Sequence, residues 1–348
     1  MDRKKKIKVL IADDSSVFRE VLRRNLSNDS GLEVVAVASN PFEARDRIVE
    51  FRPDVMTLDV EMPRMNGIDF LKKLMPQYPL PTVVISSVTD RVFDALAAGA
   101  VDFVGKPKSS QNVEAFAKEV IVKIKIASTA KIGYHKRAEK FGINHDDFEK
   151  AKRKIIAIGA STGGTKAIQT VLQSFPANMP GTVIVQHMPP VFTKLYSERL
   201  NNLCRVEVKE AEDGDEIIPG KVLIAPGGYH LRAVQRKGSY RIEMEEQNDS
   251  NKVNVHCPSV DVMFESLAKV AGNRTIGVIL TGMGNDGAAG LLSLRKSGAR
   301  TVGQDEKSCV VYGMPKVAYE LGAVERQESL DNIYGTIASL LKETKGRE

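Results

Sequence analysis

The sequence predicts two consecutive α/β domains, each built on a parallel sheet with helices on both faces. The chain has 348 residues, more than one compact domain usually holds, and its 42% apolar and 27% charged residues are typical of globular proteins. Short apolar runs alternate with amphipathic segments along residues 7–126, and a second alternation begins at Lys154. We therefore expect one domain over residues 1–126 and another over residues 154–348, joined by a linker over residues 127–153.

In the first domain, five short apolar runs are separated by helical patterns. The first helix carries an apolar stripe with the spacing i, i+4, which includes Val17 and Leu22. Asn40-Pro41 marks the start of the next helix, because Pro is tolerated in a first helical turn. The alternation predicts a parallel sheet of five strands, over Lys8–Ala12, Glu33–Ala38, Val55–Val60, Thr82–Ser86 and Val101–Val104.

Charged and hydroxyl side chains follow the strands of this first domain. Asp13 and Asp14 come after the first strand, Asp59 and Ser86 near the ends of the third and fourth, and Lys106 after the fifth. Ligands of open parallel sheets bind beyond the carboxyl ends of the strands, so these side chains are expected at one rim. Three clustered carboxylates repel one another unless a cation neutralises them, and hard oxygen ligands suit Mg²⁺. Capping of the following helices is the alternative for the acidic residues.

These residues resemble the receiver domain of two-component response regulators, over about residues 7–126. The resemblance rests on Asp13-Asp14, Leu58-Asp59, Met62-Pro63, Asn66-Gly67, Ser86 and Lys106-Pro107. It implies a flavodoxin-like fold and phosphoryl transfer from a histidine kinase to Asp59. It also implies that the three aspartates hold Mg²⁺ for this step. Lys106 would help to neutralise the phosphoryl group, and Ser86 would hydrogen-bond it.

The basic charge of the chain is local. Residues 118–154 hold eleven Lys/Arg against five Asp/Glu, which accounts for the whole net charge of +6. Charge confined in this way argues against a nucleic-acid-binding surface, and we interpret it as a solvated segment, with an acidic partner as the alternative. Cys204, Cys257 and Cys309 are odd in number and lack CxxC spacing, which favours reduced thiols in a cytoplasmic protein. No apolar run approaches the ~20 residues of a membrane span, so neither a signal peptide nor membrane insertion is expected.

The second domain opens with the apolar run Ile155–Ile158, directly followed by the glycine-rich stretch Gly159–Gly163. That stretch fits G-x-S-x-G, the sharp strand-to-helix turn that exposes a nucleophilic serine, here Ser161. A Gly/Ser loop that binds an anion at a helix N-terminus is the alternative. Neither the Rossmann nor the Walker A pattern occurs at this turn.

Two further strand ends of the second domain carry residues that could activate a serine. His187 follows the apolar strand Thr182–Gln186, and a serine nucleophile needs such a general base. Asp286 lies in the glycine-rich turn Thr281–Gly287 after the strand Arg274–Leu280, where a carboxylate could orient an imidazole. Taken singly, the histidine could be structural and the aspartate a helix N-cap. Together the three side chains predict a hydrolytic triad in the order Ser…His…Asp, which differs from the α/β-hydrolase order.

With a receiver-like domain before it, this constellation resembles the chemotaxis protein-glutamate methylesterase (CheB) family, over about residues 7–345. The motifs that carry the resemblance are Gly159–Gly164, Gln186-His187-Met188-Pro189, Phe192-Thr193, Ala225-Pro226-Gly227, His256 with Pro258-Ser259-Val260-Asp261, Thr281–Gly287 and Tyr312-Gly313-Met314-Pro315. The implied second domain is a doubly wound, mostly parallel α/β methylesterase domain.

The resemblance implies that Ser161 is the nucleophile, His187 the base and Asp286 the orienting carboxylate. The backbone N–H groups of Thr162 and Met283 would form the oxyanion hole. The implied reaction is hydrolysis of glutamate methyl esters on the cytoplasmic helices of chemoreceptors, with release of methanol. It extends to the deamidation of specific glutamines. No cofactor is expected for the esterase step.

Some features remain open at this point. Cys257 stands where a basic residue is expected after His256, and Cys309 replaces a hydroxyl or small residue. His256 is either structural or in contact with substrate, whereas His230 is expected to be structural. Phosphorylation of Asp59 is expected to relieve inhibition by a receiver that covers the catalytic cleft. A DNA-binding output domain is disfavoured, because the second domain is not basic and has no helix-turn-helix signature. A catalytically silent binding module is the other alternative.

Overall fold

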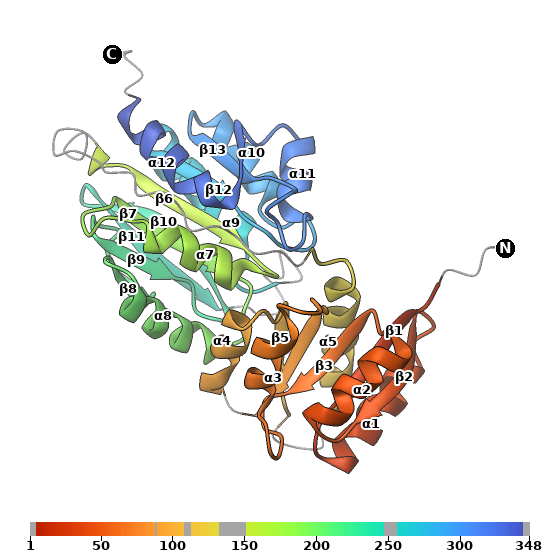
Figure 1. Cartoon of the computed structure of the whole chain (residues 1–348). Helices are drawn as coiled ribbons and strands as arrows, with labels where there is room; N and C mark the ends of the chain where they lie inside the picture. Colours follow the sequence, from red (N-terminus) through yellow and green to blue (C-terminus); the bar gives the residue numbers. More distant parts are fainter. Residues whose placement is uncertain (1–4, 88, 108–112, 132–150, 247–255, 344–348) are drawn as a thin grey trace. The chain divides into compact units, whose positions relative to one another are not determined.

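The chain divides into two compact units, Met1–Ile132 and Gly133–Glu348 (Figure 1). The computed structural model describes residues 5–87, 89–107, 113–131, 151–246 and 256–343. Most of the predicted linker, residues 132–150, lies outside these described ranges. Within them, no helix combines the length and the apolarity that crossing a bilayer requires.

The first unit contains a parallel sheet with the strand order β2-β1-β3-β4-β5, so the predicted five-stranded sheet is confirmed. All residues of β3 and β4 are buried, as expected for central strands covered on both faces. This strand order is the flavodoxin-like one, with a switch point between β1 and β3. The strands are β1 (Ile7–Ala12), β2 (Leu32–Ala38), β3 (Val55–Asp59), β4 (Thr82–Ser86) and β5 (Asp102–Gly105).

Three helices of the first unit begin after a residue whose side chain caps them. Asn40 is the N-cap of α2, and its side chain accepts from two backbone N–H groups, with Pro41 in the first turn as predicted. Leu22 is buried in α1, but Val17, expected on the same apolar stripe, is 72% exposed. The stripe is therefore narrower than the spacing indicated. The helices are α1 (Ser16–Ser27), α2 (Pro41–Phe51), α3 (Gly67–Leu74), α4 (Thr89–Ala97) and α5 (Val113–Ala127).

The second unit is built on a parallel sheet of seven strands in the order β14-β13-β12-β6-β7-β9-β8. A separate antiparallel hairpin joins β10 (Tyr229–Arg236) to β11 (Ser239–Glu246). The mostly parallel architecture predicted for this domain is thus confirmed. The sheet strands are β6 (Ile155–Ala160), β7 (Gly181–Gln186), β8 (Glu207–Glu210), β9 (Lys221–Ile224), β12 (Thr275–Ile279), β13 (Arg300–Gln304) and β14 (Arg326–Glu328).

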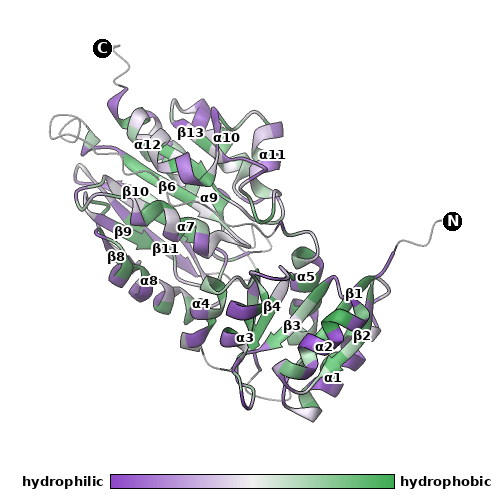
Figure 2. Ribbon diagram, in the orientation of Figure 1, coloured by the Kyte–Doolittle hydropathy of each residue, from purple (hydrophilic) through white to green (hydrophobic). Residues whose placement is uncertain are grey.

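Helices pack against this sheet around an apolar core. Every residue of β6 and β7 is buried, and Figure 2 shows β6 in the colour of apolar residues. The helices are α7 (Gly164–Gln173), α8 (Phe192–Leu203), α9 (Val260–Val270), α10 (Ala288–Lys296), α11 (Met314–Glu320) and α12 (Ile333–Lys342), with short 3₁₀ turns η2 (Gly272–Arg274) and η3 (Leu330–Asn332).

The register of the three central strands brings their carboxyl ends together. Gly159 of β6 pairs with Ile279 of β12, and Ala160 pairs with Gln186 of β7. The segments that follow β6, β7 and β12 therefore begin side by side at one edge of the sheet. This is the edge at which open α/β sheets bind ligands.

Candidate functional site

Ser161 occupies a tight turn between β6 and α7. Its backbone N–H donates to the carbonyl oxygen of Thr281 (3.0 Å), and its own carbonyl oxygen accepts from the N–H of Gly164 (2.7 Å). Gly163 in this turn has φ +77°, in the left-handed region that glycine adopts without strain. The Ser161 side chain is partly exposed, so the turn presents the serine at the carboxyl edge of the sheet.

His187 and Asp286 form a buried pair beside that turn. Nε2 of His187 lies 2.8 Å from Oδ2 of Asp286, and each side chain is 7% exposed. Nδ1 of His187 is also buried, and it has no hydrogen-bond partner in the described part of the chain, the Ser161 hydroxyl included. In hydrolases the serine–base hydrogen bond often forms only once substrate is bound. With Nε2 engaged by the carboxylate, Nδ1 is the ring nitrogen left to accept a proton.

Asp286 is held as a carboxylate by an array of donors. Its oxygens accept from the Ser259 hydroxyl (2.9 Å), the Val260 N–H (2.8 Å) and the Asp261 N–H (3.0 Å) at the start of α9. Burial would raise the pKa of Asp286, but the bond and charge of His187 and these amides together lower it to about 2. The carboxylate accepts from the first turn of α9, whose N-cap is Ser259. It does not cap the helix that follows it, which was the alternative, because the N-cap of α10 is Gly287.

Two peptide groups near Ser161 have carbonyl oxygens that are held by donors. The Ser161 carbonyl accepts from Gln186 Nε2 (2.9 Å) as well as from Gly164, and the Gly282 carbonyl accepts from the N–H groups of Gly313 (3.1 Å) and Met314 (2.8 Å). A trans peptide group points its N–H opposite to its C=O. The N–H groups of these two peptide units belong to Thr162 and Met283, so each is aimed away from its anchored carbonyl.

Gly282 allows the two loops to approach closely. A Cβ at Gly282 would lie 2.8 Å from Cβ of Ser161 and 2.4 Å from Sδ of Met314. Only glycine fits there without displacement, because real Cβ atoms do not come closer than about 3 Å to such atoms. The segment that carries Met283 therefore lies directly against the serine turn.

Two further histidines surround the pair. The ring of His256 stacks on that of His187, with centroids 4.3 Å apart and planes inclined by 22°. His230 is fully buried, and its Nδ1 accepts from the backbone N–H of Ser259. The hydroxyl of the same serine donates to Asp286. Burial lowers the pKa of His230, which favours its neutral form as an acceptor. Ser259, Val260 and Asp261, which donate to Asp286, were visible in the sequence only as part of a motif without assigned roles.

Cys204 and Cys309 do not offer a rival nucleophile. None of the three cysteines forms a disulfide within the described residues, and Cys309 is buried. Burial raises the pKa of Cys204 to about 11, so it is a neutral thiol near pH 7. Cys257 directly follows His256, whose ring stacks on that of His187.

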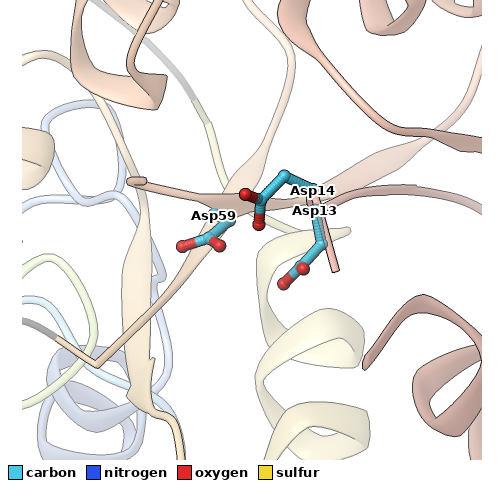
Figure 3. A group of neighbouring side chains, drawn as sticks. All are labelled: Asp13, Asp14 and Asp59. Atoms are coloured by element: carbon cyan, nitrogen blue, oxygen red, sulfur yellow. The ribbon is translucent and has the colours of Figure 1, made fainter. Parts of the chain in front are cut away.

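The first unit brings its predicted acidic residues together as well. Carboxylate oxygens of Asp13 and Asp14, which follow β1, and of Asp59, the last residue of β3, lie within 4.8 Å of one another (Figure 3). Nζ of Lys106 lies 2.8 Å from Asp13 and 2.6 Å from Asp59. Ser86, at the end of β4, is buried and its carbonyl oxygen accepts from the Lys106 N–H.

The electrostatics of this cluster fit a divalent cation. Burial, with Asp13 beside it, raises the pKa of Asp59 despite the bond from Lys106. For Lys106, burial acts in the opposite direction, but its two carboxylate partners raise its pKa and keep it charged. One lysine leaves two of the three negative charges uncompensated. Oxygen ligands with that excess charge match the preference of Mg²⁺.

Comparisons with known proteins cover almost the whole chain. Residues 156–337 match the model of the CheB methylesterase family, and residues 9–118 match that of the response regulator receiver domain. The output half is therefore of the methylesterase type, and the alternative of a DNA-binding output domain is wrong.

The chain also resembles named full-length proteins and a solved structure. It is 56% identical to protein-glutamate methylesterase/protein-glutamine glutaminase 2 of Syntrophomonas wolfei, over 98% of this chain and 99% of that one. A protein of the same activities from Salmonella typhimurium is 46% identical over 94% and 95% of the two chains. The crystal structure of the Thermotoga maritima CheB methylesterase catalytic domain is 38% identical, covers 54% of this chain and 98% of that one, and has a TM-score of 0.52.

Proposed function

The chain belongs to the CheB methylesterase family, and we propose that Ser161, His187 and Asp286 are the catalytic triad of its second unit. Like its relatives, the protein is a receiver-controlled protein-glutamate methylesterase and protein-glutamine glutaminase. The observation that carries the triad is the 2.8 Å contact between His187 and Asp286 beside the serine turn. The low pKa of Asp286 keeps it negative at every physiological pH, as an orienting carboxylate must be.

The reaction proceeds through an acyl-enzyme. Ser161 Oγ bonds to the carbonyl carbon of a glutamate γ-methyl ester while Nδ1 of His187 takes the hydroxyl proton. The oxyanion lies between the N–H groups of Thr162 and Met283, and its collapse breaks the bond to the methoxy oxygen. The imidazolium returns the proton, so methanol leaves. Water then attacks the acyl group with His187 as base again, which gives glutamate and free Ser161. For a glutamine side chain the leaving molecule is ammonia.

The receiver is the site of control. Asp59 accepts a phosphoryl group from a chemotaxis histidine kinase, with its carboxylate oxygen bonding to phosphorus as the kinase imidazole leaves. Asp13, Asp14 and Asp59 would hold Mg²⁺, which neutralises phosphoryl charge when bound. Lys106 adds a second positive charge next to Asp59, and the Ser86 hydroxyl hydrogen-bonds the transferred group.

On this proposal the chain has three functional parts. Residues 1–126 are the regulatory domain, residues 127–153 the linker and residues 154–348 the catalytic domain. Phosphorylation of Asp59 relieves inhibition of the catalytic site by shifting the population of an inhibited state. The substrates are the cytoplasmic helices of chemoreceptors, which implies that the enzyme works in the cytoplasm.

Methanol release from methylated chemoreceptor membranes tests the proposal. Wild-type protein and the Ser161→Ala variant are compared, each with and without a small phosphodonor. We expect release that requires Ser161 and increases with the phosphodonor. Equal release by both proteins would exclude Ser161 as the nucleophile. No release by either would favour a catalytically silent binding module.

A further inference from the structure

Two buried polar side chains outside the proposed triad donate hydrogen bonds to the backbone of the serine turn. They lie at or just beyond the ends of the two strands next to β6. Gln186 is the last residue of β7, and Thr281 follows β12. The two residues are 3% and 1% exposed, so water cannot replace a hydrogen bond that either of them loses. Both hydrogen-bond to the backbone of the turn.

Gln186 controls the direction of one peptide group. Its Nε2 donates to the Ser161 carbonyl oxygen (2.9 Å) and to the His187 carbonyl oxygen (3.3 Å). The Ser161 carbonyl and the Thr162 N–H belong to a single planar unit, so holding the oxygen fixes the opposite direction of the N–H. Gly164 makes room for this amide, since a Cβ there would lie 2.1 Å from Gln186 Oε1.

Thr281 links the two loops that supply the proposed oxyanion donors. Its carbonyl oxygen accepts from the Ser161 N–H, and its hydroxyl lies 3.0 Å from the Thr162 carbonyl oxygen. The same hydroxyl accepts from the Val311 N–H (3.0 Å) and lies 3.2 Å from the Val311 carbonyl oxygen. Its own N–H donates to Oε1 of Gln304 (2.8 Å). Thr281 therefore holds the peptide groups on either side of the Ser161–Thr162 unit, from the segment that leads directly to Met283.

We propose that Gln186 and Thr281 are positioning residues that set the direction and spacing of the two oxyanion N–H groups. The inference rests on the proposed function, because it assigns Thr162 and Met283 as those donors. Gln186 sets the direction of the first donor, and the Thr281 hydroxyl sets its distance from the loop that carries the second. Stabilisation of an oxyanion depends on donors placed about 3 Å from the atom that becomes negative, so small displacements of either loop reduce it.

The chain offers a closely matched control for the Thr281 hydroxyl. Thr301, on β13 of the same sheet, is also completely buried. Its hydroxyl donates to the Ala323 carbonyl oxygen (2.7 Å) and accepts from the Glu325 N–H (3.0 Å). Thr301→Val therefore removes the same kind of buried, doubly bonded hydroxyl from a position that does not contact the serine turn.

The test compares Thr281→Val, Thr281→Ser, Gln186→Met and Thr301→Val with wild type in the full chain. The rate of methanol release is measured against the concentration of methylated receptor, and thermal unfolding is recorded for each protein. We expect Thr281→Val and Gln186→Met to lower kcat by about tenfold to a hundredfold with KM changed by less than about twofold. Thr281→Ser keeps the hydroxyl and should restore most of kcat. Thr301→Val should keep wild-type kcat at a Tm similar to that of Thr281→Val.

Three results would overturn the inference while leaving the proposed function intact. The first is a Thr281→Val protein with wild-type kcat, and the second is a loss of kcat in Thr301→Val as large as in Thr281→Val. The third is a change confined to KM, which would indicate substrate binding and not oxyanion stabilisation. A wild-type protein without Ser161-dependent release would instead overturn the proposed function and this inference with it.

Discussion

Nε2 of His187 lies 2.8 Å from Oδ2 of Asp286, and this contact leaves Nδ1 as the ring nitrogen for the proposed role of base. The Ser-His-Asp arrangement of chymotrypsin-like enzymes uses the two ring nitrogens the other way round. The sheet order gives the reason for the arrangement of the three segments. β6 lies between β12 and β7. The serine turn follows β6, so the residue that follows β7 and the loop that follows β12 reach it from its two sides. The imidazole reaches the carboxylate through its far nitrogen, Nε2.

Replacing Asp286 with Asn should lower kcat by about a thousandfold to ten-thousandfold. All four hydrogen bonds described for this carboxylate come from donors, so an amide NH₂ group would meet a donor at either oxygen position. An NH₂ group facing His187 would favour the tautomer protonated on Nδ1, which cannot act as a base. Methanol release and Tm should be measured together. A kcat within tenfold of wild type would contradict the assignment of Asp286.

The architecture and the main side chains of the site could be predicted from sequence, because each follows an apolar strand. Ser161, His187 and Asp286 all come directly after or close to the end of a buried strand, and parallel strands share one carboxyl edge. The same logic applied to Asp13 and Asp59 in the first unit. Periodicity alone predicts the burial of single side chains less well, because it does not show how far the neighbouring elements extend. Val17 lies on the predicted apolar stripe and is nevertheless exposed.

The supporting contacts could not be predicted in this way. The orientation of the His187 ring depends on where the carboxylate of Asp286 sits in space, which no local pattern encodes. The stacking of His256 joins residues that are far apart in sequence. Gln186 and Thr281 resemble ordinary polar residues at strand ends, and only the hydrogen bonds reveal what they hold.

Replacing Asp261 with Asn should stabilise the second unit at pH 7.5 but not at pH 4. Burial, with repulsion from Asp286 and Glu265, raises the pKa of Asp261 to about 6, despite the bond from the Gly290 N–H. The pKa of this carboxyl group is higher in the folded than in the unfolded protein, so the protein loses stability as pH rises from about 4 to about 6. Asn stays neutral and avoids this loss, so we expect a gain of about 1–3 kcal/mol at pH 7.5. Urea unfolding at the two pH values measures it, and an equal effect at both would contradict it.

Chelation of Mg²⁺ and the substitution Asp59→Asn should each abolish the increase in methanol release caused by a phosphodonor. Asp59 is the proposed acceptor, and the cluster that it forms with Asp13 and Asp14 carries more negative charge than Lys106 offsets. Release without the phosphodonor should be unchanged, because the proposed esterase mechanism has no step that uses a metal. Asp46→Asn removes an exposed carboxylate of the same unit and should leave the increase intact. An increase that persists in Asp59→Asn would exclude Asp59 as the acceptor.

Removal of the His256 ring should lower kcat/KM about threefold to tenfold, because a stacked aromatic pair contributes about 0.5–1.5 kcal/mol. The ring on which His256 stacks is that of the proposed base. The His256 ring is the exposed partner of the stack, with its centroid 4.3 Å from that of buried His187. His256→Ala loses the stack, whereas His256→Phe keeps an aromatic face without the ring nitrogens. If the stack positions His187, Phe should retain kcat within about twofold of wild type. If His256 instead contacts substrate through its nitrogens, Phe and Ala should be equally impaired and the defect should appear mainly in KM. Steady-state methanol release by the two variants separates these roles.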